Sequence, residues 1–160
     1  MYLSPGVELF LKRLMIRHVK LWPPFLGAGI HVVRLSRDFR SLEVRMKLRF
    51  WNRNYVGTHF GGSLYSMTDP FYMILLMENL GRDVVVWDKS AQIRYRAPGR
   101  GRVHAHFELT QERIDEIRAG LAEHGKVEPV FQIRILDADE TLIAEVDRTI
   151  HIHLKKKKMQ

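Results

Sequence analysis

Apolar and charged residues alternate most regularly between Leu42 and Phe50. Every second residue of this stretch is apolar, and the residues between them carry charges. Since successive side chains of a strand point to opposite faces of its sheet, the pattern predicts a strand with one buried and one solvated face. Weaker patterns predict further strands at 29–36, 84–95, 102–110, 127–136 and 142–154, with a hairpin turn at 137–140.

Two other stretches have apolar residues on one face at helical spacing. The first follows Ser4-Pro5, which suits a helix cap and first residue, and it is expected to stop at Pro23-Pro24. Two positions are possible for this amphipathic helix. It could cover one end of the sheet, or, because its polar residues are basic, it could lie on a membrane surface. The second, 111–124, predicts a short amphipathic helix that ends before Gly125.

A third helical stretch, 64–80, is apolar around nearly its whole circumference and is followed by Gly81 as a helix cap. Such a helix must be buried on several sides, so a sheet is expected to wrap it. The order of elements favours an α+β fold over alternating βαβ units. One domain is expected at 28–154, after an N-terminal helix and linker at 1–27 and before a basic tail at 155–160.

Composition narrows the class of protein. The formal net charge is +8, but four of the positive charges are the run Lys155 to Lys158, and no DNA- or RNA-binding motif accompanies them, so no nucleic-acid partner is expected. No apolar run is long enough to span a bilayer. Basic residues interrupt the apolar residues of the N-terminal stretch, which is unlike the apolar core of a signal peptide. A cytoplasmic protein without stable membrane insertion is expected. The absence of cysteine excludes disulfides and thiolate metal sites.

Asp69 is the only acidic residue between Asn54 and Glu78, and it lies within the apolar helical stretch. An ionised carboxylate is costly to bury unless it is paired or used. Two structural interpretations stay open. Asp69 could cap a second helix that starts at Pro70, or a single helix could be kinked between Ser66 and Pro70, with the carbonyl of Ser66 left free.

The loop before this helix carries a recognisable pattern. Asn54-x-x-Gly57-x-x-x-Gly61-Gly62, with an aspartate seven residues after the second glycine, resembles the loop and central helix of the hotdog-fold acyl-CoA thioesterases, especially the phenylacetyl-CoA type. In that family the pattern Asn-x-x-Gly-x-x-His-Gly-Gly precedes the helix, and an acidic residue on the helix acts on the thioester. The pattern also resembles an uncharacterised hotdog subfamily.

One position departs from the family pattern. Phe60 stands where the family has histidine, and His59 comes one position early and is expected to point elsewhere. This departure keeps a second hypothesis open, in which the chain is a non-catalytic hotdog domain that binds acyl-CoA or an acyl carrier, or that has a regulatory role.

The resemblance implies a hotdog fold: an α+β domain with a curled antiparallel sheet wrapped around a long central helix, here with an added N-terminal helix. It also implies thioester hydrolysis. Asp69 would activate water or attack directly, the backbone N–H groups of Gly61 and Gly62 would stabilise the oxyanion, and Asn54 would orient water or bind the carbonyl. Asn54 could instead be a loop-forming residue. In this family the acid and the oxyanion donors commonly come from different protomers, so we expect a shared site in a homodimer or a dimer of dimers.

The expected substrate is an acyl-CoA or acyl-carrier thioester, with coenzyme A as part of the substrate and no separate cofactor. Arg94, Arg96 and Arg100 surround a Pro-Gly turn and offer forked donors that suit the coenzyme A phosphates. Four aromatic residues are expected to line the acyl pocket: Phe60, Tyr65, Phe71 and Tyr72.

Two further features concern the late strands. His104 with His106, and His151 with His153, are pairs at i and i+2 that can bind zinc, but no acidic third ligand is evident and no metal site is expected. Arg148 alternates in step with Val146, Ile150 and Ile152, which are expected to face the core. Either a bulge in the strand or a salt-bridged interior arginine would explain a charged residue at such a position.

Overall fold

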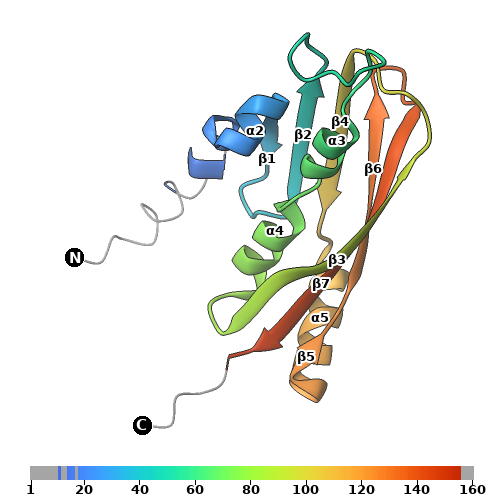
Figure 1. Ribbon diagram of the computed structural model, residues 1–160. Helices are drawn as coiled ribbons and strands as arrows, with labels where there is room; N and C mark the ends of the chain where they lie inside the picture. Colours follow the sequence, from blue (N-terminus) through green and yellow to red (C-terminus); the bar gives the residue numbers. More distant parts are fainter. Residues whose placement is uncertain (1–10, 12–13, 17, 156–160) are drawn as a thin grey trace.

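The computed structural model describes residues 11, 14–16 and 18–155, and in this part of the chain seven strands form one antiparallel sheet (Figure 1). In chain order they are β1 (Ile30–Leu35), β2 (Ser41–Lys47), β3 (Val84–Tyr95), β4 (Arg102–Glu108), β5 (Lys126–Val127), β6 (Val130–Asp137) and β7 (Leu142–Leu154). Their order across the sheet is β1-β2-β4-β6-β7-β3, and the short β5 pairs with β7. β3 has the predicted bounds and lies at one edge of the sheet.

The helices with described bounds are η1 (Val19–Leu21), α2 (Pro23–Ala28), α3 (Gly61–Ser66), α4 (Phe71–Leu80) and α5 (Gln111–His124). α5 was predicted with these bounds, and Gly125 follows it with a φ of 70°. Most of the helix predicted before Pro23 lies outside the described residues. The proline pair itself begins α2, because proline suits the first turn of a helix, where its missing N–H has no acceptor to lose.

α3 and α4 lie on the side toward which the sheet curls (Figure 1). Phe71 and Leu75 of α4 have no exposed surface, which confirms that the apolar stretch is wrapped. Aromatic rings extend this core: Phe71 lies 5.2 Å from Phe107, and Tyr72 stacks on Phe131 at 4.2 Å, both measured between ring centroids. Phe71 and Tyr72 are thus packed against the sheet.

The stretch 64–80 is two helices, so the single kinked helix is wrong. α3 ends at Ser66 and α4 begins at Phe71. The carbonyl of Ser66 is not free, because the N–H of Asp69 donates to it at 3.1 Å and closes a turn. The alternative is right that a second helix follows, although it begins one residue later than predicted, and wrong about the cap: the residue that caps α4 is Pro70, and no side-chain capping hydrogen bond is made. Proline cannot donate to Ser66, which is why the helix is interrupted here.

Two strands, β6 and β2, differ from their predicted bounds by three residues at one end. β6 is separated from β5 by Pro129, whose carbonyl accepts from Ile150 N at 3.0 Å. β2 ends at Lys47, and Phe50 is 77% exposed although it continues the apolar alternation.

Asn52 explains why the chain leaves the sheet after Lys47. Its buried side chain accepts a hydrogen bond from Arg49 N at 2.7 Å, and it donates to the carbonyls of Lys47 and Ala28 at 3.0 and 2.8 Å. These bonds turn the chain away from the sheet and fasten the loop at 48–60 to α2.

Within the described residues, no helix has both the length and the apolar character that crossing a membrane requires.

Candidate active site

α3 begins with the glycine pair. The N–H groups of Ser63 and Leu64 both donate to the carbonyl of Phe60, at 2.9 and 3.1 Å. The described part of the chain offers no hydrogen-bond acceptor to the N–H groups of Gly61 or Gly62, as is usual for the leading residues of a helix. These two donors are therefore available to a ligand.

Neighbouring aromatic side chains approach both glycines closely. A Cβ atom on Gly61 would lie 2.9 Å from the hydroxyl of Tyr95, and one on Gly62 would lie 2.5 Å from the ring of Phe60. Tyr95 is the last residue of β3, so the edge strand of the sheet touches the start of α3. Any larger residue at either position would have to displace an aromatic ring.

Asn54 forms the loop that leads into α3. Its side-chain oxygen accepts from Val56 N at 3.1 Å and from Thr58 N at 2.9 Å, and its amide group donates to the Thr58 hydroxyl at 2.9 Å and the His59 carbonyl at 3.3 Å. The structure thus gives the Asn54 side chain a full set of partners within its own loop.

His59 lies in the wall of a cleft of about 370 Å³ that Gly61, Leu64, Tyr95 and Arg96 also line. The side chains of His59 and Phe60 diverge, in keeping with the expectation that the two point to different places: Phe60 lines a separate groove beside Gly62. His59 is buried, and its Nε2 lies 3.2 Å from the carbonyl of Gly101. Burial lowers the pKa of His59, which favours the neutral imidazole.

Asp69 lies in the turn between α3 and α4, and its side chain is 45% exposed. One carboxylate oxygen is 3.4 Å from Nη1 of Arg148, a β7 residue whose side chain is only 2% exposed. The same Nη1 lies 2.9 Å from the carboxylate of Asp88 on β3. Arg148 is therefore the salt-bridged interior arginine that was one of the two explanations for its parity.

Two further groups hold the Arg148 guanidinium. Its Nη2 donates to the Thr68 hydroxyl at 3.2 Å, and the guanidinium carbon lies 5.3 Å from the centre of the Tyr65 ring. Tyr65, expected in an acyl pocket, therefore packs over the arginine beside Asp69. Sequence reasoning did not connect Arg148 with Asp69 or Asp88, and the only signal was the charge at a core-facing position.

The electrostatic effects on Asp69 oppose one another. Burial raises the pKa of Asp69 above its ordinary value, the positive charge of Arg148 opposes this, and the negative charge of Asp88 adds to the increase. Since two carboxylates share one guanidinium, the cluster carries a net negative charge. Asp69 is consequently a partly exposed carboxylate that is more basic than an ordinary aspartate.

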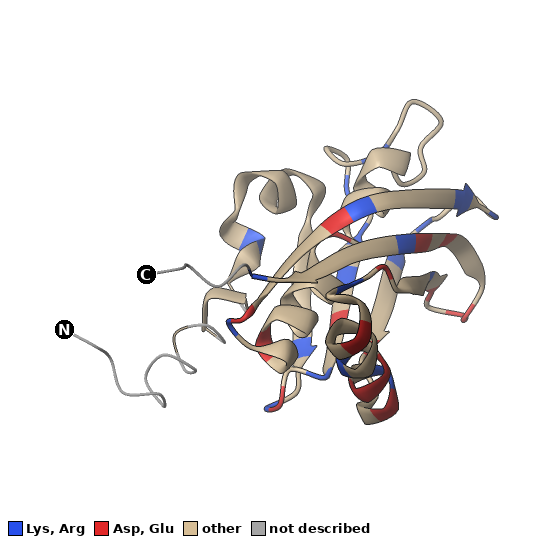
Figure 2. Ribbon diagram, turned by 90° about the horizontal axis from the view of Figure 1, so that it is seen from below, with Lys and Arg blue, Asp and Glu red and all other residues tan. Residues whose placement is uncertain are grey.

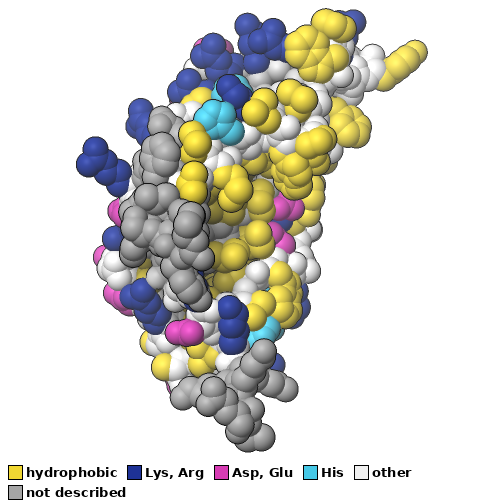
Figure 3. Space-filling view, turned by 90° about the vertical axis from the view of Figure 1, so that its left-hand side faces the viewer, with side chains coloured by type: hydrophobic (Ala, Val, Ile, Leu, Met, Phe, Trp, Pro, Cys, Tyr) yellow, Lys and Arg dark blue, Asp and Glu magenta, His cyan; other side chains and the backbone are white. Residues whose placement is uncertain are grey.

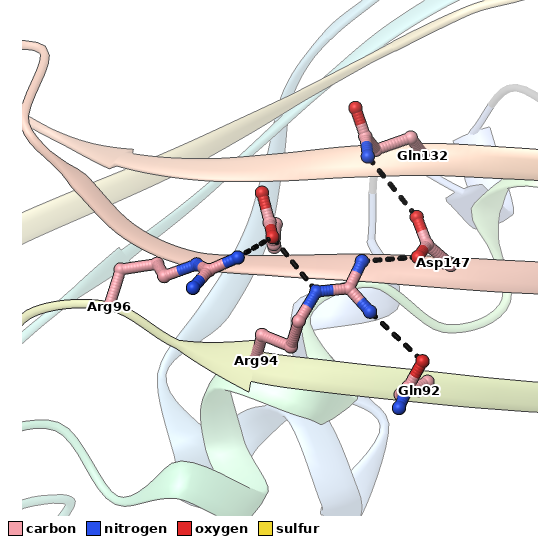
Figure 4. A network of polar contacts seen from close by, with 6 residues as sticks. Gln92, Arg94, Arg96, Gln132 and Asp147 are labelled. Atoms are coloured by element: carbon pink, nitrogen blue, oxygen red, sulfur yellow. Dashed lines mark hydrogen bonds and ion pairs between the residues drawn. The ribbon is translucent and has the colours of Figure 1, made fainter.

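Arg94 and Arg96 of the arginine cluster share one network of polar contacts (Figure 4). Arg94 donates to Glu145 at 2.9 Å and to Gln92 at 2.9 Å, and it is ion-paired with Asp147. Arg96 is also ion-paired with Glu145.

The three arginines therefore differ in whether neighbouring carboxylates neutralise their positive charge. The positive charges of Arg94 and Arg96 are balanced by two carboxylates. Arg100 is exposed and has no hydrogen bond or ion pair within the described residues.

The histidine pairs have other partners. His151 donates a hydrogen bond from Nδ1 to the Glu128 carboxylate at 2.7 Å and stacks on Trp87, with ring centroids 4.5 Å apart. His106 bonds the Ser41 hydroxyl at 2.9 Å. The described residues contain no group of three or more histidine, aspartate or glutamate side chains that could hold a metal ion.

Comparisons with known proteins agree with this architecture. A family model described as a domain of unknown function (DUF4442) matches residues 11–152. No curated protein matches the sequence. Among solved structures, PA5026 of Pseudomonas aeruginosa, a protein of unknown function called a probable thioesterase, has a TM-score of 0.77 and 20% identity, with 89% of this chain and 96% of that chain covered.

Two other solved structures are similar. Thioesterase HI1161 of Haemophilus influenzae has a TM-score of 0.64 and 14% identity, with 90% of this chain and 92% of that chain covered. OLEI01261 of Chlorobaculum tepidum, a protein of unknown function, has a TM-score of 0.68 and 18% identity, with 93% and 95% covered. The predicted hotdog fold is confirmed: an α+β domain whose curled antiparallel sheet wraps a central helix, here divided at 67–70.

The first prediction concerns the guanidinium of Arg148. Arg148→Met should reduce the free energy of unfolding at neutral pH by about 3–5 kcal/mol, because Asp88 and the partly buried Asp69 lose their common cation. Without Arg148 the pKa of Asp69 is raised further, and a carboxyl whose pKa is raised by folding destabilises the folded state as the pH rises through that range. The deficit should therefore be smaller at mildly acidic pH.

Urea denaturation of wild type, Arg148→Met and Arg148→Lys at two pH values measures this effect. Arg148→Lys keeps the positive charge but loses the forked N–H donors of the guanidinium. Its free energy of unfolding should be reduced less than that of Arg148→Met. A deficit of Arg148→Met that does not change with pH would show that packing, and not charge, sets the role of Arg148.

Proposed function

The chain belongs to the family described as a domain of unknown function (DUF4442), and we propose that it hydrolyses acyl thioesters, with acyl-CoA or an acyl-carrier thioester as the substrate. The observation that carries the proposal is Asp69, a partly exposed carboxylate with a raised pKa beside a buried guanidinium. The names of the structural neighbours PA5026 and HI1161 point to the same class of reaction.

In the proposed reaction Asp69 takes a proton from a water molecule, which then attacks the thioester carbonyl carbon. The resulting oxyanion accepts hydrogen bonds from the N–H groups of Gly61 and Gly62. When it collapses, the C–S bond breaks, and the leaving thiolate takes the proton from Asp69, which gives a carboxylic acid and a thiol and restores the carboxylate. In a direct attack by Asp69 on the carbonyl, the thiolate would leave and water would then hydrolyse the anhydride to restore the carboxylate, with the same residues in use. Asn54 contributes by holding the loop before α3 in place, through its bonds to Thr58 and His59.

We place this reaction at an interface between two protomers. Asp69 does not line the cleft that contains Gly61, so the acid and the oxyanion donors of one chain do not meet in that cleft. β3 is a 12-residue edge strand that touches α3 through Tyr95 at one end and Arg148 through Asp88 nearer the other end. An antiparallel pairing of β3 with its copy would bring the Tyr95 end of one chain toward the Asp88 end of the other.

One observation favours a second function, the non-catalytic binding domain. Phe60 replaces the histidine of the resembling family, is 56% exposed and covers Gly62. A release assay for free thiol over a panel of acyl-CoAs distinguishes the two functions. Binding of acyl-CoA by calorimetry without thiol release from any member of the panel would favour the binding domain.

The second prediction concerns catalysis. Asp69→Asn should lower the turnover number by about 100-fold or more, because an amide cannot accept the proton of the attacking water. Acyl-CoA binding should persist, since asparagine has nearly the same size. Asp139→Asn, which changes an exposed carboxylate in the β6–β7 hairpin, is the matched control and should keep full activity. A folded Asp69→Asn protein with normal turnover would remove Asp69 from the mechanism.

The third prediction separates the arginines. We propose that Arg100, with Arg96 at the rim of the cleft, meets the coenzyme A phosphates, and that Arg94 mainly supports the sheet through Glu145 and Asp147. Arg100→Glu should raise KM for acyl-CoA, with an effect that shrinks as salt screens the wild-type attraction, and it should leave KM for a small thioester without the nucleotide unchanged.

Arg94→Glu should instead lower the melting temperature, because it places a third carboxylate beside two others. Equal changes in KM for both substrates in Arg100→Glu would mean that this residue does not recognise the nucleotide.

The fourth prediction concerns assembly. We expect a homodimer or a dimer of dimers at micromolar concentration by light scattering, because the β3 edge leaves backbone groups available for pairing. Ala91→Pro, placed within the edge strand, should weaken the assembly by removing an N–H donor, and activity should fall together with the oligomeric mass. A fully active monomer would contradict the shared site.

A further inference from the structure

One end of the molecule exposes a set of large apolar side chains. They come from only two segments: Leu21, Trp22 and Leu26 are 62%, 52% and 59% exposed, and Phe50 and Trp51 are 77% and 54% exposed. Single exposed apolar residues are normal in soluble proteins, whereas a gathered set marks an interaction site. Figure 3 shows such side chains side by side on this face of the molecule.

The two segments form one continuous surface. A shallow groove of about 480 Å³ is lined by Leu21 and Leu26 from one segment and by Trp51 from the other. Trp51 also borders a second groove of about 390 Å³, which extends to Phe60 at the start of α3. Buried Asn52 holds the loop against α2 through its bond to the Ala28 carbonyl, so the position of Trp51 relative to α2 is fixed.

Positive charges surround these apolar side chains. Lys20, Lys47 and Arg49 line the first groove, and Arg53 lines the second. The Arg49 guanidinium lies 5.3 Å from the centre of the Trp51 ring. The chain has no aspartate or glutamate at 18–37 or at 44–68, and Figure 2, where acidic residues colour the ribbon red, shows such residues on α5 and on the strands instead.

We propose that this surface, made of the five apolar residues and the four cations, docks the protein onto an anionic lipid bilayer. Tryptophan favours the membrane–water interface, and segments that lie in this interface insert tryptophan, phenylalanine and leucine side chains. Lysine and arginine are attracted to anionic headgroups. A second copy of the chain fits less well, because a two-fold interface would place these cations against themselves. The binding is peripheral and does not depend on the proposed hydrolysis.

Flotation of the full chain with lipid vesicles tests the proposal. The protein should bind vesicles that contain about 30% phosphatidylglycerol, bind vesicles of phosphatidylcholine alone much less, and dissociate as the ionic strength rises. Phe50→Ser/Trp51→Ser and Arg49→Gln/Arg53→Gln should each weaken binding about tenfold or more. The Lys155 to Lys158 run is present in every variant, so its attraction cancels from the comparison.

Matched controls come from the far side of the sheet. Val130→Ser and Arg134→Gln change an exposed apolar residue and an exposed arginine of β6, and both should bind vesicles like wild type. A Trp22→Phe/Trp87→Phe variant leaves Trp51 as the only tryptophan, and its emission should shift to shorter wavelength with anionic vesicles. This readout does not depend on activity.

Three results would overturn the proposal: no binding to anionic vesicles, equal binding by folded surface variants and wild type, or an unshifted Trp51 emission in the presence of bound vesicles. If the aromatic variant instead dissociates an oligomer and no vesicle binds, the surface is an interface between copies of the chain. Preferential binding of an RNA or DNA oligonucleotide that the aromatic variant retains would assign the cations to nucleic acid.

Discussion

The candidate site depends on the ion pairs and the hydrogen bond of the buried Arg148 guanidinium. It lies on β7 between core-facing neighbours, where an uncompensated charge would be strongly destabilising. Its partners come from two other parts of the chain: Asp88 from the edge strand β3, and Thr68 with Asp69 from the turn between α3 and α4. The charge is therefore compensated only when the edge strand, the neighbouring strand and the central helices have come together.

The two carboxylates around Arg148 are not equivalent. Asp88 is 2.9 Å from Nη1 and its side chain is 22% exposed, whereas Asp69 is 3.4 Å away and 45% exposed. Asp88 is thus the main partner of the arginine. Asp69 receives enough positive potential to be tolerated at a partly buried position, but not enough to lower its pKa below the ordinary value. A carboxylate held tightly by arginine would be a weak base, so this unequal sharing preserves the basicity of Asp69.

Local patterns in the sequence were sufficient for much of the fold. The bounds of α5 and β3 followed from periodicity and from flanking residues such as Gly125, and the wrapping of α4 followed from its apolar circumference. What failed depended on contacts between distant residues. Phe50 continues the alternation of β2, yet Asn52 turns the chain away by bonding a carbonyl of α2. Arg148 is separated from Asp88 by 60 residues, and no periodicity identifies such a partner.

The sequence identified residues of the candidate site, but it did not predict how their side chains lie relative to one another. His59 occupies the cleft of Gly61 because Asn54 and the Gly101 carbonyl hold it there, and both contacts belong to the folded loop. The four aromatic residues expected at an acyl pocket divide among different environments: Phe71 and Tyr72 in the core, Tyr65 over Arg148, and Phe60 at the surface. Aromatic spacing on a helix indicates burial, and it does not distinguish core from pocket.

The glycine pair and Asp69 carry different weight as indications of function. Gly61 and Gly62 have a steric reason to be glycine, because the rings of Tyr95 and Phe60 occupy the space of a side chain at each position. The structural reason for an aspartate at position 69 is weaker, because its ion pair with Arg148 is the longer of the two. Asp69 caps no helix, and Arg148 already has Asp88 as its closer carboxylate partner. Asp69 is thus a partly exposed carboxylate that is more basic than usual and only loosely held by Arg148, and these properties suit the role that the proposed hydrolysis gives it.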